Sequence, residues 1–549
     1  MPRELPSAVS GALRELKERP RVPKEPSATI EVETAPKPAI GQAPGLKIEV
    51  KAFRFSGLTA VREQRLQRVV RKYLGPARSF DDLQAAVGEV AEYLRAAGFF
   101  LAQAYLPAQQ VKDGVIEIAV LEGRIGQVKV EREGDVPVSK RAVDSVLSVL
   151  KPGMVIREGE IERSLFLLGD LRGFQVRSVM QPGEKPGTAD LVVTLSPARR
   201  LEAAVDYDNF GSPFTGQNRA GGTFSWNNPL HLGDSLSART VFSFNGGLAF
   251  GRAAYLLPIG PYGTKLGAAY SRLNYELGTS VFEPLGLHGS AEVVSGYVLH
   301  PLARGRNLNL FLTLGYDHRE LEDTNDQFSQ TGIRRMNVGT LSLVGDSRDL
   351  FLGGGINNFS LSYTTGWLDF DRSFQRQVDA SRIGHKTGGN YHKLNAAFSR
   401  LQQIGGPFLG FFAMSGQWAS KNLDPIEKIS LGGPNTVRAY LEGEGVSDEA
   451  LLITTELRYA IPQPEVFRLP GDLIGAAFVD VGFGNIHKDP LATDKPKTIT
   501  RSGAGLGLTW GRPDDFLVRS SVAWRLTEAP IDGTGDRVPQ FFIQVQKSF

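Results

Sequence analysis

After Arg200 the chain contains no helical pattern and is built from short segments in which apolar and polar residues alternate. A period of two predicts β-strands whose two faces meet different surroundings. Sixteen such segments can be counted, an even number, as single-chain outer-membrane barrels require. They span 201–210, 219–227, 234–244, 248–258, 264–277, 289–302, 306–323, 334–346, 355–370, 389–402, 407–420, 450–461, 472–485, 501–511, 515–527 and 539–549.

The two faces of these predicted strands differ in a way that indicates lipid on one side and water on the other. In 450–461 the apolar face is formed by Leu451, Ile453, Leu457 and Tyr459, and the opposite face by Thr454, Glu456 and Arg458. A soluble β-sandwich also buries one face of each strand, but its interior does not carry ionic groups in the middle of strands. We therefore predict a sixteen-stranded antiparallel transmembrane β-barrel over 199–549, with an apolar outside and a wet lumen.

Before the barrel the chain contains two copies of one small α+β pattern, over 46–122 and 123–198. Each copy begins with a strand, continues with two helices and ends with two strands. Gly98-Phe99 in the first copy matches Gly173-Phe174 in the second at an offset of 75 residues. Self-similarity at a fixed spacing predicts two repeats of one domain.

The N-terminal residues 1–20 predict a short amphipathic helix with Val9, Leu13 and Leu16 on its apolar side, ended by Pro20. Residues 21–45 are rich in proline and have no periodicity, so they predict an extended linker. The first twenty residues lack the apolar core of a signal peptide. For an exported protein we therefore expect the signal to have been removed or the start to lie elsewhere.

Composition agrees with an exported protein and offers no chemistry for a reaction. Cysteine is absent, and the net charge of +3 predicts no nucleic-acid partner. No two of the seven histidines stand at metal-ligand spacing, and neither a GxSxG nor a phosphate-loop motif occurs. Asp206 and Asp208 share a strand face, where we expect pairing with lumenal cations rather than catalysis. We predict no catalytic residue, no cofactor and no metal, and hence no enzyme.

Two short motifs are the most specific feature of the chain. "GGPNTVRAYLEGE" begins at Gly432, inside the long connection 421–449 between the eleventh and twelfth predicted strands, and "AAFVDVGFG" spans 476–484. With the helix, the linker, the two repeats and the barrel, they make the chain resemble the outer-membrane translocators of two-partner secretion. These are the haemolysin and filamentous haemagglutinin transporters of the POTRA-barrel superfamily. The resemblance extends over essentially the whole chain.

The resemblance implies that the loop 421–449 folds back into the lumen and that its arginine contacts the acidic residue of the second motif. The matching loop residues are Gly432, Gly433, Val437, Arg438 and Tyr440, and the matching wall residues are Phe478, Asp480 and Gly482. Alternation independently places Asp480 on the inner face, because a carboxylate facing hydrocarbon would be costly. Glu456 and Arg458, also inward, are further candidates for this network.

One residue departs from the family pattern. Ala439 stands where the first motif usually has glycine. If that position needs a positive φ, alanine adopts it only at a cost. The departure therefore leaves the backbone geometry at position 439 as an open question.

The resemblance also implies a function. The repeats would be POTRA-like domains 1 and 2 in the periplasm, where they bind a large, β-rich exoprotein by strand addition to a sheet edge such as 100–106 or 173–180. The barrel, in outer-membrane lipid and as a monomer, would then export it without ATP, while the N-terminal helix plugs the lumen. An assembly factor for barrel proteins and a passive solute porin are the alternatives.

Overall fold

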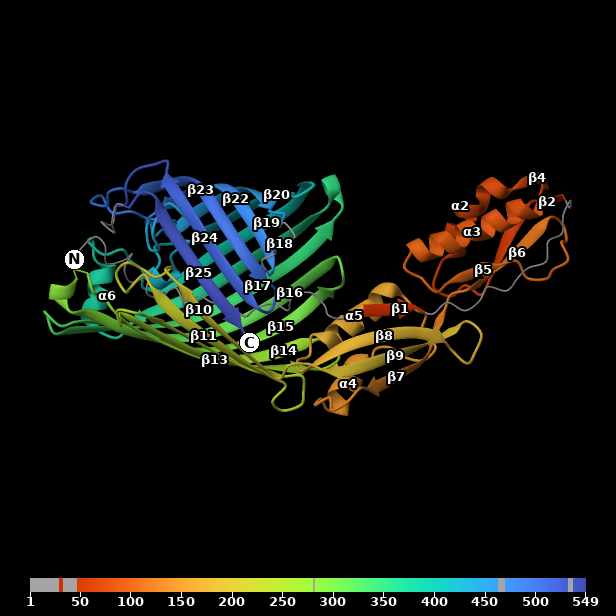
Figure 1. The fold of residues 1–549 in the computed structure, drawn as a ribbon, viewed down its shortest axis with the longest axis horizontal. Coiled ribbons are helices and arrows are strands. Elements are labelled where there is room, and N and C mark those ends of the chain that lie inside the picture. Colours follow the sequence, from red (N-terminus) through yellow and green to blue (C-terminus); the bar gives the residue numbers. More distant parts are fainter. Residues whose placement is uncertain (1–28, 33–46, 280–281, 463–469, 532–536) are drawn as a thin grey trace.

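The structure is a computed structural model that describes residues 29–32, 47–279, 282–462, 470–531 and 537–549. The molecule is elongated, with two small α+β units in line beside one end of a large barrel (Figure 1). The predicted plug helix over residues 1–20, with Val9, Leu13 and Leu16, lies outside the described residues. Within the described ranges, no helix has the length and the apolar character needed to cross a membrane.

The first unit follows the predicted pattern and has its own apolar core. Helix α3 begins with a capping box, in which Ser79 and Asp82 satisfy each other's backbone amides. The three-stranded sheet has the order β3-β6-β5. The elements are β2 (Ile48–Val50), β3 (Ala52–Ser56), α2 (Glu63–Val70), η2 (Arg71–Tyr73), β4 (Gly75–Arg78), α3 (Phe80–Ala96), β5 (Gln103–Tyr105) and β6 (Val115–Leu121).

The second unit repeats this arrangement and gains one strand from the proline-rich segment. Its elements are β7 (Arg124–Arg132), α4 (Lys140–Leu147), α5 (Glu158–Gly169), β8 (Phe174–Pro182) and β9 (Thr188–Pro197). Strand β1 (Thr29–Val32) pairs in parallel with β8, and the sheet order is β1-β8-β9-β7.

Strand β1 changes two expectations. Four residues of the predicted linker form a strand, because the backbone of an edge strand pairs with any extended segment that reaches it. The candidate edge 173–180 lies in β8, which has a neighbour on each side and is therefore not free. Strand β5, within the other candidate segment, is at the edge of its sheet.

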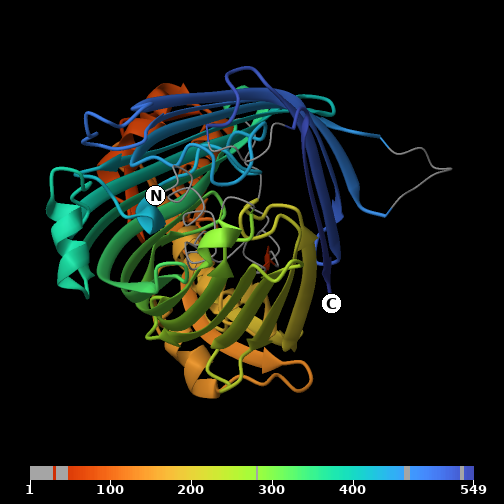
Figure 2. The ribbon, with the colours of Figure 1, turned by 90° about the vertical axis from the view of Figure 1, so that its left-hand side faces the viewer.

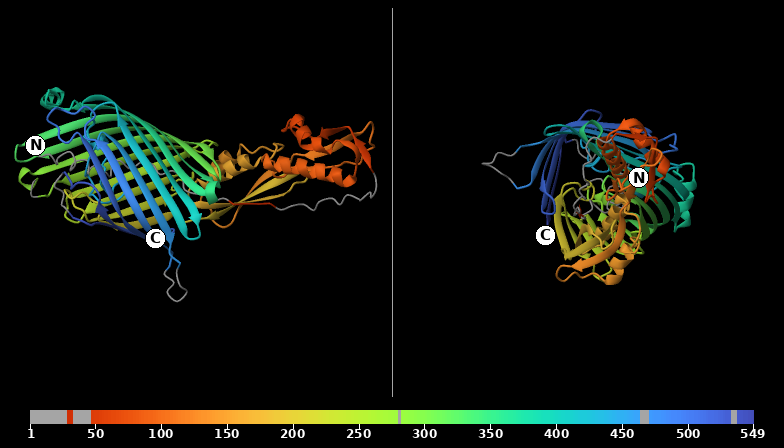
Figure 3. Two further views of the ribbon diagram at one scale, coloured as in Figure 1. Left: turned by 90° about the horizontal axis from the view of Figure 1, so that it is seen from above. Right: turned by 90° about the vertical axis from the view of Figure 1, so that its right-hand side faces the viewer.

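The second unit is attached to the near rim of the barrel by buried polar contacts. Arg304 donates from Nε and Nη2 to the two carboxylate oxygens of Asp170, at 2.9 and 2.6 Å. Lys265 Nζ donates to the carbonyl of the same aspartate at 2.9 Å. Because these ionic groups are almost fully buried, they fix the unit in line with the barrel (Figure 3).

The barrel confirms the predicted fold: sixteen antiparallel strands, β10 to β25, close on themselves, and β25 pairs with β10. The strands are β10 (Leu201–Asp208), β11 (Arg219–Asn227), β12 (Ser235–Ser243), β13 (Leu248–Ile259), β14 (Thr264–Glu276), β15 (Leu287–Arg304), β16 (Leu308–Asn325), β17 (Gln330–Asp349), β18 (Gly355–Phe370), β19 (Gly389–Gly405), β20 (Phe408–Ala419), β21 (Glu449–Ala460), β22 (Asp472–Asn485), β23 (Thr498–Arg512), β24 (Phe516–Arg525) and β25 (Gln540–Ser548). Short helices η3 (Glu283–Leu285), η4 (Phe351–Gly353), α6 (Ser373–Ala380) and η5 (Pro425–Glu427) lie in the connections.

The faces of the strands follow the predicted alternation. On β22 the side chains of Phe478 and Asp480 are buried, whereas Val479 and Phe483 are exposed on the outer surface. Because β10 starts beside the second unit, the connection from β20 to β21 lies at the far end of the barrel. Near the start of the barrel wall, Asp206 and Asp208 pair with Arg239 and Arg219, at 3.0 and 2.9 Å.

Candidate functional site

The candidate site is the connection between β20 and β21, residues 420–448, which we call the lumenal loop. All of its residues are described, and between 421 and 448 only Asn435 is exposed. Viewed from the end opposite the small units, this segment lies inside the ring of strands (Figure 2). A long connection usually runs over the surface, so its burial requires specific partners for its polar groups.

Arg438, near the middle of the lumenal loop, contacts Asp480 on the barrel wall through three hydrogen bonds. Its Nε and Nη2 donate to the two carboxylate oxygens, each at 2.8 Å. Its backbone amide donates to Oδ2 at 3.1 Å. The two side chains are 6% and 1% exposed, so this bidentate pair is shielded from water.

The other two residues of the wall motif shape the place where the arginine binds. The Arg438 guanidinium lies over the Phe478 ring, 3.4 Å from its centroid. A Cβ at Gly482 would lie 3.1 Å from Cγ2 of Val437 and 3.0 Å from Cδ2 of Leu452, so the loop packs tightly against the wall at this glycine. The motif therefore combines a stacking surface, an anion and a gap.

Glu456 and Arg458 on β21 extend this network. Glu456 Oε1 accepts from Arg438 Nη1 at 2.7 Å, and its Oε2 accepts from Arg458 Nε at 2.7 Å. Thr454 donates its hydroxyl to Asp480 Oδ1 at 2.9 Å. The structure thus brings Glu456 into contact with Arg438, and Arg458 joins the network through Glu456.

The remaining loop residues named from the sequence also lie at the wall. Tyr440 is 1% exposed and donates its hydroxyl to the carbonyl of Glu528 at 2.8 Å. Gly433 has a φ of +140°, which favours glycine. A Cβ at Gly432 would lie 2.4 Å from the carbonyl oxygen of Leu441, because the loop turns tightly there.

The sequence reasoning missed a second buried ion pair of the same loop. Arg501 on β23 donates from Nε and Nη2 to Glu444 Oε1, at 2.8 and 2.6 Å. The two residues are 2% and 0% exposed. Glu444 is the last residue of the loop motif, and Arg501 belongs to a strand with alternating faces. The sequence therefore marks each residue separately, but no pattern in it indicates that the two form a pair.

The first half of the lumenal loop contacts a second set of wall strands, which the sequence also did not indicate. Asp424 pairs with Arg334 of β17, and Glu427 pairs with Arg319 of β16 and Lys393 of β19. The second half contacts β21, β22 and β23 through the residues above. The loop is therefore fixed to two sets of wall strands and lies inside the lumen.

The structure answers the question of the backbone at Ala439. Among the described non-glycine residues, those with positive φ do not include Ala439, so the position does not call for glycine. What it needs is space: a Cβ on Gly503 of β23 would lie 2.3 Å from the Ala439 methyl group. Gly503 pairs in register with Asp480 and so faces the lumen. The glycine-rich strand provides the room for this alanine.

Comparison with known proteins agrees with this architecture. Residues 187–510 match the family described as haemolysin secretion/activation protein ShlB/FhaC/HecB, and residues 48–123 match the ShlB-type POTRA domain. The chain is 26% identical over 548 residues to the heme/hemopexin transporter protein HuxB of Haemophilus influenzae, covering 98% of this chain and 94% of that protein.

Two further comparisons concern CdiB. The chain is 25% identical over 508 residues to the outer membrane transporter CdiB of Escherichia coli, covering 90% of this chain and 82% of that protein. A solved structure of CdiB from Escherichia coli shares the fold with a TM-score of 0.75 at 20% identity, covering 99% of this chain and 98% of that one. The family match spans more than half of the chain. The chain therefore belongs to the haemolysin secretion/activation protein family ShlB/FhaC/HecB, and it is an outer-membrane transporter of two-partner secretion with its POTRA domain in the periplasm.

Proposed function

We propose that the lumenal loop is the element that conditions the secretion pore, and that Arg438, through Asp480, holds it in place. The observation that carries this proposal is the bidentate, water-shielded pair between the middle of the loop and the barrel wall. A loop that lies inside the lumen narrows the passage, so its displacement changes the width of the pore. The protein transports and does not catalyse.

The geometry favours export of an unfolded chain. Beside the tip of the lumenal loop, a cavity of about 600 Å³ remains, lined among others by Asn435 and Thr436. This volume is far smaller than a folded domain of 50 residues or more. Folding of the exoprotein outside the cell would then draw the chain outward without ATP.

The two N-terminal units would receive the exoprotein in the periplasm. Strand β5 is a sheet edge with Tyr105 exposed beside it, so an extended segment can add to it by backbone hydrogen bonds. The printed names of the relatives do not fix one cargo for this chain, so we propose only the class, a large β-rich exoprotein. We further propose a monomer in outer-membrane lipid, since the barrel closes within one chain.

The proposed export is tested by deleting the gene and measuring the exoprotein in the medium. We expect the exoprotein to disappear from the medium, and the full-length chain supplied from a plasmid to restore it. The abundance of unrelated outer-membrane barrels serves as the control and should stay constant. If those barrels were lost together with the exoprotein, the protein would be an assembly factor instead.

Deleting residues 1–20 is expected to raise the ion conductance of the purified protein in planar bilayers and to leave secretion mostly intact. Strand β1 pairs with the unit nearest the barrel, and the eight residues 21–28 between the predicted helix and β1 can span roughly 26 Å when extended. That reach lets the predicted helix enter the lumen from the end beside this unit. Adding the helix back as a free peptide should lower the conductance again, and an unchanged conductance after deletion would contradict the plug.

A further inference from the structure

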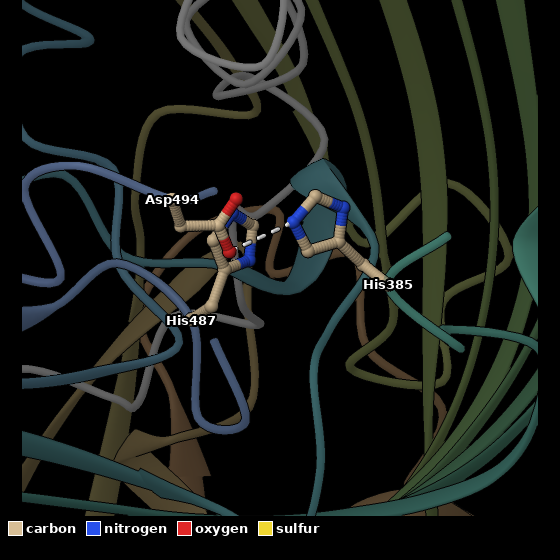
Figure 4. A group of neighbouring side chains, drawn as sticks. All are labelled: His385, His487 and Asp494. Carbon is tan, nitrogen blue, oxygen red and sulfur yellow. Dashed lines mark hydrogen bonds and ion pairs between the residues drawn. The ribbon is translucent and has the colours of Figure 1, made fainter. Parts of the chain in front are cut away.

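Two histidines and an aspartate from separate surface connections meet at the outer end of the barrel (Figure 4). His385 follows α6 in the connection from β18 to β19, and His487 and Asp494 lie in the connection from β22 to β23. His385 Nε2 and Asp494 Oδ2 are 3.2 Å apart, and the two imidazole rings stack with centroids 3.9 Å apart. One ligand atom of each residue lies within 4.8 Å of the others.

The donor set has the chemistry of a zinc site. Neutral imidazole and carboxylate are ligands of Zn²⁺, and three protein ligands with one open position are a common arrangement. The Leu491 amide donates to Asp494 Oδ2 at 2.8 Å and orients the carboxylate.

The ammonium group of the neighbouring Lys428 has hydrogen-bond partners other than the three residues of the cluster. Lys428 Nζ lies 3.2 Å from Nδ1 of His487. Its ammonium is also bound by Asp448 Oδ1 at 3.0 Å and by the carbonyl of Ile486 at 2.7 Å. The imidazole can therefore turn toward a metal ion without leaving Lys428 without a partner. The side chains of His385 and Asp494 are 32% and 17% exposed, which leaves the cluster accessible from outside.

The cluster is directly connected to the lumenal loop. Asn422 at the start of that loop donates to the carbonyl of His385 at 2.8 Å and to that of Asp489 at 2.9 Å. Its Oδ1 accepts from the Asp489 amide at 2.8 Å. A metal ion bound to the cluster would therefore join the β18–β19 and β22–β23 connections, both of which contact Asn422 at the start of the lumenal loop.

We propose that His385, His487 and Asp494 form a Zn²⁺-binding site that links these connections over the outer end of the lumenal loop. Binding requires the stacked rings to turn apart, because both nitrogens must lie about 2.0–2.1 Å from one ion. The site uses none of the residues that attach the middle of the loop to the wall.

The proposal is tested by titrating the purified full-length protein with Zn²⁺ in detergent and measuring the bound metal after dialysis. We expect one equivalent to bind. His385→Ala and Asp494→Asn should each raise the dissociation constant for Zn²⁺ at least about 10-fold. Losing a ligand should cost at least as much affinity as losing a hydrogen-bond partner of a ligand. His487→Gln, which keeps the size of the side chain, should do the same.

His288→Ala is the matched control, since His288 pairs with Asp326 at 3.3 Å but has no second imidazole in that pair. Its Zn²⁺ binding should equal that of the unchanged protein, and heat-modifiable migration in gels confirms that each variant is folded. Unchanged binding in the folded cluster variants, or no bound Zn²⁺ in the original protein, would overturn the proposal.

Discussion

Replacing Arg438 with alanine should release the middle of the lumenal loop from the barrel wall and reduce secretion strongly. The variant leaves Asp480, 1% exposed, without its bidentate partner. Removing one member of a buried ion pair costs about 3–5 kcal/mol, so the fraction of released loop should rise on the order of 100-fold or more. Because the chain contains no cysteine, Val437→Cys provides a single buried thiol whose labelling rate measures that release.

The pairing itself is tested by combining Arg438→Ala with Asp480→Ala in the Val437→Cys background. The double variant should label little faster than either single variant, because both single changes remove the same interaction. Arg458→Ala is the matched control: it removes an arginine bound to Glu456 but no contact of the loop with the wall. Additive effects of the two changes would show that Arg438 and Asp480 act independently.

The barrel could be predicted in detail because lipid outside and water inside impose a period of two on every strand. That period also placed Asp480 on the inner face. The choice of Arg438 as its partner did not follow from any spacing and came from the motif resemblance. The pairs Arg334–Asp424 and Arg501–Glu444 have no such motif support, because a charge in a wet lumen can pair with any opposite charge that the loop brings near.

Contacts between distant connections also could not be predicted, because no spacing or motif in the sequence links their residues. His385 and His487 are far apart in the sequence, and they meet only where their surface connections fold together beside Asn422 of the lumenal loop. Strand β1 is hidden in a proline-rich segment because its pairing depends on the free edge of β8 rather than on its own pattern. The glycines of β23 lie in the predicted strand 501–511, but their use as a space for Ala439 requires the position of the loop.

The contact between Ala439 and Gly503 has a consequence for how these two positions can vary. The loop carries the extra methyl group at Ala439, and the wall residue facing it has no side chain. The lumenal loop and β23 approach so closely here that the space between positions 439 and 503 holds one methyl group but not two. We therefore expect the residue types at 439 and 503 to be coupled, so that the effect of a change at one depends on the other.

Gly503→Ala is accordingly expected to displace the lumenal loop, with Val437→Cys labelling about 10- to 100-fold faster if overpacking costs about 1–3 kcal/mol. Ala439→Gly should largely restore slow labelling and secretion, incompletely because the Trp524 carbonyl would still lie 3.1 Å from the new Cβ. Gly507→Ala on the same strand face is the control, since its Cβ would meet no described atom closer than 3.6 Å. Equal effects of the two alanine substitutions, or no rescue by Ala439→Gly, would mean that Gly503 serves the strand rather than the loop.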